Sequence, residues 1–190
     1  MKTLKILFTL FLLALTIQSC KKENTINKSQ QIIPIPNGDF EAWDNTPNLN
    51  IWQTNSCPLC VPAYETYIVK KVTDATSGQF AAKFIFNNVY KSYATNKFQI
   101  SLHPTFLAGF VKSNIAIGDT ATIHIDLFSG NTIIDNGNFF ETNSNSNYRQ
   151  IEIPISQNSN TIDSAIIKIS GGKKQGTELY VDNLYLTKNE

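Results

Sequence analysis

The sequence predicts an all-β protein, a single antiparallel β-sandwich of the jelly-roll type. The main observation is that, from Ile33 onward, apolar and polar residues alternate with a period of two in short runs, which clusters of Asn, Gly, Asp and Ser separate. In addition, no run of ten residues places apolar side chains at the i, i+3, i+4 and i+7 positions of an amphipathic helix. Many short strands without intervening helices favour a sandwich over a parallel α/β sheet.

The N-terminal segment, residues 1–19, resembles a bacterial lipoprotein signal peptide. Lys2 and Lys5 precede a twelve-residue, almost wholly apolar run from Ile6 to Ile17. This run is shorter than the roughly 20 residues that span a bilayer, and it fits the apolar core of an export signal. Cys20 follows directly, so we predict that residues 1–19 are removed and that Cys20 is acylated. An ordinary secretory signal is the alternative.

Residues 20–33 are predicted to form a flexible linker, because they are mostly polar and lack apolar periodicity. The β-domain is then expected over residues 34–190. The full chain carries 16 Lys and Arg against 15 Asp and Glu, and loss of Lys2 and Lys5 with the signal leaves 14 against 15. No basic patch stands out, which argues against nucleic acid as a partner.

Two further cysteines, Cys57 and Cys60, form a C-x-x-C motif in a loop-like stretch between Asn55 and Pro62. Such a pair occurs as a local disulfide, as free thiols, as half of a metal site or as a redox pair. In an exported protein a small disulfide that stiffens a loop is the favoured interpretation. The other three remain open, although a four-cysteine zinc site would need a second pair.

The strands are predicted where β-branched and aromatic residues alternate with polar ones between turn residues. In Ala121–Phe128, for example, Ile123, Ile125 and Leu127 face one way while His124 and Asp126 face the other. The remaining expected strands are Tyr64–Thr73, Ala81–Val89, Lys97–Leu102, Phe106–Lys112, Thr132–Glu141, Ile151–Ile155, Ala165–Ser170 and Glu178–Thr187.

Four motifs recur together in a known family. They are NGDFEAW at 37–43, Trp52, DATSGQFA at 74–81 and YVDNLYL at 180–186. Their order and spacing resemble the β-jelly-roll carbohydrate-binding modules of bacterial glycan-handling proteins, in particular the carbohydrate metabolism domains of Bacteroidetes lipoproteins. The resemblance covers about residues 35–188. It implies a galactose-binding-like jelly roll whose first and last strands are neighbours.

The resemblance also implies a structural calcium ion at the seam between the two chain ends. Ca²⁺ takes several oxygen ligands from carboxylates and carbonyls. We expect them from the carboxylates of Glu41 and Asp182 and from carbonyls around Asp39 and Ser77, with Phe40 and Trp43 buried against the core. The alternative is that Asp39 and Asp182 cap turns while Glu41 is solvated.

Glycan binding is the function that the resemblance implies, by stacking of sugar rings on aromatic side chains that polar groups accompany. A groove is expected around His124 and Asp126, with Lys83 and Lys112 on neighbouring strands. The candidate ligand contacts are Trp52, Tyr67, Tyr90, Tyr93, His124 and Asp126.

The expected protein is a monomeric, non-catalytic, lipid-anchored module of the bacterial outer membrane that captures polysaccharide, facing the periplasm or the cell surface. The sequence contains neither a G-x-S-x-G nor an H-E-x-x-H motif. One alternative is a structural or adhesive surface lipoprotein that binds a protein partner. A second is a glycan-active enzyme with paired acids.

Overall fold

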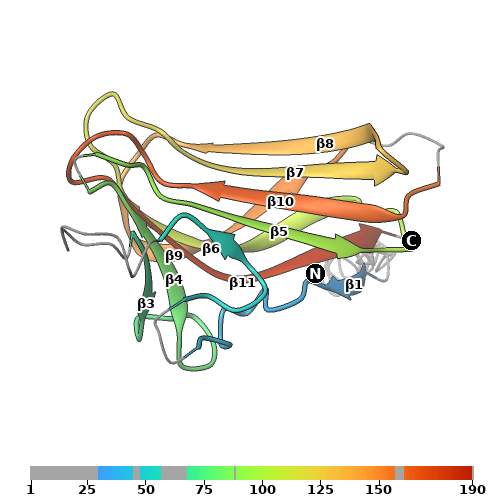
Figure 1. Ribbon diagram of the computed structural model, residues 1–190, viewed down its shortest axis with the longest axis horizontal. Coiled ribbons are helices and arrows are strands. Elements are labelled where there is room, and N and C mark those ends of the chain that lie inside the picture. The colour runs from blue at the N-terminus through green and yellow to red at the C-terminus, as the bar shows by residue number, and fades with distance from the viewer. Residues whose placement is uncertain (1–29, 45–47, 57–67, 88, 157–160, 190) are drawn as a thin grey trace, which may run out of the picture.

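Two antiparallel sheets pack face to face in this protein (Figure 1). The computed structural model describes residues 30–44, 48–56, 68–87, 89–156 and 161–189, in which eleven strands form. One sheet has the order β3-β4-β11-β6-β9, with β1 also paired to β11, and we call it the terminal sheet. The other has the order β2-β5-β10-β7-β8, and we call it the opposite sheet.

The strands of the terminal sheet are β1 (Gln30–Pro34), β3 (Val69–Val72), β4 (Ala81–Ile85), β6 (Phe106–Asn114), β9 (Asn145–Pro154) and β11 (Glu178–Asn189). Those of the opposite sheet are β2 (Gln53–Thr54), β5 (Tyr93–Gln99), β7 (Ala121–Ser129), β8 (Thr132–Glu141) and β10 (Ser164–Ser170). The pairings of these eleven strands are all antiparallel, so the predicted all-β sandwich is confirmed.

The core lies between the sheets and follows the period-two alternation. Ile123 and Ile125 of β7 are fully buried, as are Ile167 and Ile169 of the neighbouring β10. Leu179, Val181 and Leu186 of β11 meet them from the terminal sheet, together with Leu107 and Val111 of β6. Because successive side chains of a strand point to opposite faces, His124 and Lys168 are placed on the outer face of the opposite sheet.

The N-terminal boundary differs from the prediction. Residues 30–33 were expected in the linker, but β1 pairs with the last five residues of β11, from Gln30↔Asn189 to Pro34↔Tyr185. Most β1 side chains are exposed, so the strand has no alternation for the sequence to reveal. Its backbone hydrogen bonds are what place it in the sheet.

Three other stretches were missed. β5 begins at Tyr93 rather than Lys97 and ends at Gln99 rather than Leu102. The two-residue β2 is too short for a periodic signal, and β9 begins at Asn145 rather than Ile151 because its first half is polar. By contrast, β8 has the predicted bounds, Thr132–Glu141. Cys20, Cys57, Cys60 and Tyr67 lie outside the described residues, so the predictions that concern them stay predictions. Within the described ranges no helix has the length and apolar character needed to cross a bilayer.

Candidate functional site

The seam between the two chain ends is built around Asn37. The side-chain Nδ2 of Asn37 donates to the carbonyls of Ala42 and Asn50 at 3.0 and 2.8 Å, and its Oδ1 accepts from the backbone amide of Ala42 at 2.9 Å. Asn37 and Phe40 have positive φ angles of 48° and 55°, which an ordinary extended strand does not allow. The motif at 37–43 is therefore a compact turn and not a continuing strand.

This turn contacts the last strand directly. The Leu184 amide donates to the Gly38 carbonyl at 2.7 Å, and a Cβ at residue 38 would overlap the Leu184 carbonyl oxygen. Glycine is thus required at 38 for the close approach of the two backbones. Phe40 is fully buried, and Trp43 packs against the core while its Nε1 donates to the Phe40 carbonyl at 2.6 Å. The predicted neighbourhood of the first and last segments is confirmed.

Glu41 and Asp182 both bind the loop between β3 and β4. Asp182 Oδ2 accepts from the Thr76 amide and hydroxyl, both at 2.6 Å, and from the Ser77 amide at 3.1 Å. Glu41 Oε1 accepts from the amides of Gln79 and Phe80 at 2.8 and 2.9 Å. The two carboxylates thus hold opposite halves of one loop, with Gly78 between them.

The donor set at the seam fits a hard cation in one respect. Asp182 is fully buried and its Oδ1 has no hydrogen-bond partner, so one oxygen of a desolvated carboxylate lacks a compensating charge or donor. No group of three or more His, Cys, Asp or Glu side chains in the described residues is arranged for a metal. A cation here would therefore need backbone carbonyls beside Glu41 and Asp182. The side chain of Asp39 is exposed.

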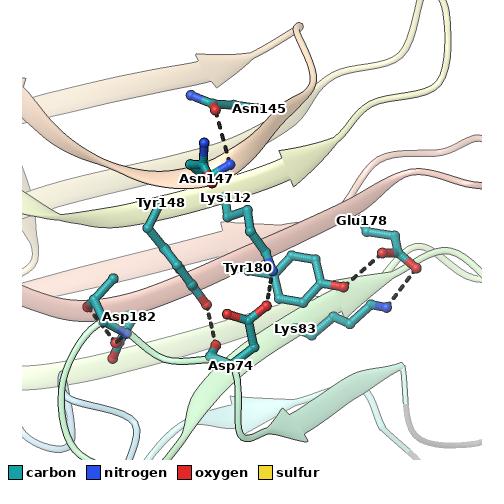
Figure 2. A network of polar contacts seen from close by, with 10 residues as sticks. Asp74, Lys83, Lys112, Asn145, Asn147, Tyr148, Glu178, Tyr180 and Asp182 are labelled. Carbon is teal, nitrogen blue, oxygen red and sulfur yellow. Dashed lines mark hydrogen bonds and ion pairs between the residues drawn. The ribbon is translucent and has the colours of Figure 1, made fainter.

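The outer face of the terminal sheet carries a closed polar network (Figure 2). Lys83 pairs with Glu178 at 2.7 Å, Lys112 pairs with Asp74, and the Tyr180 hydroxyl donates to Glu178 at 2.9 Å. The ammonium groups of Lys112 and Lys83 lie 4.1 and 5.0 Å from the Tyr180 ring centroid.

Tyr148 adds β9 to this network, because its hydroxyl donates to the Asp74 carbonyl at 2.7 Å. Burial raises the pKa of Tyr148, and the charges of Asp74 and Asp182 raise it further. Lys83 and Lys112 are thus paired with acids, and their ammonium groups cover the Tyr180 ring. The expectation that Lys83 and Lys112 share a groove with His124 is wrong, since they lie on the other sheet.

The outer face of the opposite sheet has a different character. His124 Nε2 lies 2.7 Å from Asp126 Oδ1 and its Nδ1 lies 2.6 Å from Asn138 Oδ1. Lys168 donates to Asp126 Oδ2 at 3.1 Å and remains half exposed. Asp126 was expected to line the surface but is only 4% exposed, because His124 and Lys168 cover it. Its role here is to position these two side chains.

One row of residues that runs across the four strands next to His124 ends in an exposed aromatic residue on each side. Strand register aligns Tyr93 of β5 with Ser170 of β10, Ser170 with Thr122 of β7, and Thr122 with Phe140 of β8. Tyr93 is 45% and Phe140 is 64% exposed. Three strand spacings separate them, a span of about 14 Å. Phe140 was not predicted as a ligand contact; the register of β8 against β7 places it on the face of His124.

The other predicted ligand contacts divide into two groups. Trp52 was expected at the surface but is 4% exposed, because its ring stacks on Phe40 with centroids 5.3 Å apart and its Nε1 donates to the Asn37 carbonyl at 3.0 Å. That prediction is wrong, since the indole belongs to the core. Tyr90 is 63% exposed in the loop before β5, next to the strand that carries Tyr93.

Sequence comparisons identify no relative, whereas structural comparisons define the class of fold. No family model matches the chain, and no curated protein matches its sequence. A cyclase from Fischerella sp. TAU is similar with a TM-score of 0.53 and 16% identity, over 84% of this chain and 97% of its own. A glycoside hydrolase-like protein from Bacteroides thetaiotaomicron has a TM-score of 0.52 and 11% identity, and the match spans 65% of this chain and 58% of that protein.

Carbohydrate-binding modules are also among the structural neighbours. TmCBM61, solved in complex with β-1,4-galactotriose, aligns with a TM-score of 0.46 and 12% identity, over 82% of this chain and 97% of its own. All these identities are low, so the likenesses concern the fold alone and say nothing of the ligand of this chain. The class that the two sheets define is the jelly-roll β-sandwich, and the cyclase and the glycoside hydrolase-like protein share this fold.

Proposed function

We propose that this protein is a non-catalytic glycan-binding module whose binding face is the outer face of the opposite sheet. The observation that carries the proposal is the row from Tyr93 to Phe140. Two exposed rings flank the small side chains of Ser170 and Thr122, which leaves a flat strip on which sugar rings can stack.

The neighbouring row supplies hydrogen-bonding groups for sugar hydroxyls. Thr95, Lys168, His124 and Asn138 are aligned across β5, β10, β7 and β8. Asp126 holds both His124 and Lys168 from below, so their polar ends are fixed before a ligand arrives. The terminal sheet is the poorer candidate, because ammonium groups cover its central tyrosine ring.

The proposal is tested by retardation of the protein in native gels that contain soluble polysaccharides. Tyr93→Ala and Phe140→Ala are expected to abolish the retardation that the wild-type protein shows with its glycan. Tyr148→Ala is the matched control, because it removes a tyrosine from the outer face of the other sheet. Unfolding midpoints of all variants establish that they are folded. Full retardation of the Tyr93 and Phe140 variants would contradict this choice of face.

The proposal includes a lipid anchor at Cys20 and a structural Ca²⁺ held by Glu41 and Asp182. The anchor would tether the module to the outer membrane, on its periplasmic or external side. An intact-mass measurement of protein extracted from the membrane tests it: residues 1–19 should be missing and the mass should include acyl chains. The calcium ion would supply positive charge to the unpartnered oxygen of Asp182 and would be structural, not catalytic.

A further inference from the structure

Four connecting loops lie side by side at one end of the sandwich. They join β4 to β5, β10 to β11, β6 to β7, and β8 to β9, and the strands that they join have the same order in both sheets. Glu178 at the start of β11 is paired with Ile85 and Asn114, the last residues of β4 and β6, which places the three ends together. In Figure 1 these loops lie at the left, whereas both labelled termini lie at the right.

Hydrogen bonds join neighbouring loops across this end, which we call the tip. The Gly171 amide donates to the Ser92 carbonyl at 3.0 Å, and Lys174 Nζ donates to the Ile117 carbonyl at 2.9 Å. The loop of residues 171–177 is thus in contact with the β4–β5 loop on one side and with the β6–β7 loop on the other.

The tip presents apolar side chains to solvent. Ile117 is 98% exposed, Val89 is 67% exposed and Tyr90 is 63% exposed. These are three of the eight large apolar side chains that are exposed in the described residues, so a large share of such surface is gathered on two loops. An almost fully exposed isoleucine at the apex of a turn makes no contribution to the core of its own domain.

The turn that carries Ile117 is firmly held. The backbone amide of Asp119 donates to the Ala116 carbonyl at 2.9 Å, and Gly118 has a φ of +71°. The buried Asp119 carboxylate accepts from the amides of Lys173 and Lys174, both at 2.8 Å, and from the Thr177 hydroxyl at 2.6 Å. Ile117 is therefore displayed on a preorganised turn, which lowers the entropy cost of binding.

The exposed charges of the tip are all positive. Lys91, Lys173 and Lys174 are exposed in its loops, and the only acid there, Asp119, is buried and fully used by the loop itself. The acids on the adjoining strand ends are engaged as well: Glu178 pairs with Lys83 and Glu141 pairs with Arg149. In a chain whose total charges nearly cancel, this end is basic.

We propose that the tip is an interfacial docking site for an anionic lipid bilayer. Ile117, Val89 and Tyr90 enter the boundary between headgroups and acyl chains, and the three lysines bind the anionic headgroups. A bilayer deforms around protruding side chains, whereas a folded protein partner would need a separate pocket for each loop. The tip adjoins the proposed glycan-binding row, because Tyr93 begins β5 and Ser170 ends β10, but the two sites use different side chains.

The test is cosedimentation of the full chain with vesicles. Vesicles of phosphatidylcholine mixed with phosphatidylglycerol are expected to bind the protein more tightly than vesicles of phosphatidylcholine alone, and added salt should weaken this binding. Lys173→Gln is expected to weaken it about fivefold, the factor for one lysine near an anionic surface. Ile117→Ser is expected to weaken vesicle binding both with and without added salt.

Matched controls separate the tip from the rest of the chain. Ile32→Ser replaces an exposed isoleucine at the opposite end, and Lys188→Gln replaces a lysine there, so neither should change the binding. All variants share the same N-terminal segment, so differences between them report the tip alone. Binding of Ile117→Ser and Lys173→Gln at wild-type strength would overturn the proposal, as would equal binding of the wild-type protein to both kinds of vesicle.

Discussion

Glu41 and Asp182, from opposite ends of the chain, bind the two halves of one loop. Glu41 accepts the amides of Gln79 and Phe80, while Asp182 accepts those of Thr76 and Ser77. Each carboxylate accepts hydrogen bonds from backbone amides that would otherwise lack partners in the loop. The first turn, the β3–β4 loop and the last strand are thereby joined into a single unit, and its stability should depend on all three.

Gly78 lies between the two halves of this loop, and we predict that Gly78→Ala is destabilising. Its φ is +66°, and an added Cβ would overlap the carboxylate of Glu41. The backbone strain and the displacement of Glu41 together should cost about 2–3 kcal/mol of unfolding free energy. Chemical denaturation of the purified variant measures this loss.

Gly130→Ala is the control for this prediction. Gly130 has a similar φ of +61°, but nothing lies within 4 Å of its would-be Cβ, so only the backbone strain remains. Its cost should be about 1 kcal/mol. Equal costs at the two glycines would show that the contact with Glu41 contributes nothing.

We predict that calcium raises the thermal unfolding midpoint and that Asp182→Asn removes the rise. The unpartnered Oδ1 of Asp182 is the atom that a bound cation would satisfy, and asparagine lacks the charge. Even in chelator, the variant should lose about 2 kcal/mol, because its hydrogen bonds to Thr76 and Ser77 are no longer charge-assisted. Differential scanning fluorimetry with excess calcium or with chelator measures both effects.

Asp126→Asn serves as the comparison for the calcium response. Asp126 is also buried, but it lies on the other sheet and both its oxygens have partners. It should retain the calcium-dependent rise in midpoint. If the wild-type protein shows no rise, the ion must be discarded, and the seam is then held by hydrogen bonds alone.

The sequence allowed the fold to be predicted where burial alternates and failed where it does not. The buried isoleucines of β7 and β10 repeat every second residue, and this identified both strands. β1 has almost no buried side chain, and its pairing with β11 is a backbone relationship that no local pattern encodes. Its residues were therefore assigned to the linker.

The site was predictable to a similar extent. The meeting of Glu41 and Asp182 at one loop followed from a motif order, whereas the placement of aromatic rings did not. Trp52 lies in loop-like sequence, yet Phe40 and the Asn37 carbonyl hold it in the core. Phe140 looks like a core residue in sequence, yet strand register places it on the outer face. Whether a single ring is buried depends on tertiary packing, which the local sequence pattern does not reveal.

We predict that Asp119 makes the stability of the fold sensitive to acid. Burial alone would raise the pKa of this carboxyl, but hydrogen bonds from Thr177 and from the amides of Lys173, Thr120 and Lys174 outweigh it and hold the pKa below its ordinary value of 3.8. A carboxyl whose pKa is lower in the folded state stabilises the fold above the unfolded-state pKa. We expect that contribution to be complete above about pH 5 and to disappear as the pH falls below about 4.

Asp119→Asn distinguishes this group from the other carboxylates. The variant should lose about 2–3 kcal/mol at neutral pH, since four donors then face a neutral amide. Urea midpoints measured from neutral pH to about pH 3 should fall less steeply for the variant than for the wild-type protein. Parallel curves would mean that Asp119 does not titrate in this range.

Trp52→Phe and Tyr93→Ala should have opposite effects on stability and on glycan retention. Trp52 is 4% exposed, so phenylalanine there leaves a cavity and removes the hydrogen bond to the Asn37 carbonyl, at a cost of about 2–3 kcal/mol. Tyr93 is 45% exposed on the outer face, so its truncation should change the unfolding free energy by only about 0.5 kcal/mol. Retardation in polysaccharide gels should be lost for Tyr93→Ala and kept for folded Trp52→Phe. A stable Trp52→Phe variant that no longer binds glycan would show that the indole contacts the ligand and that the binding site lies at the seam.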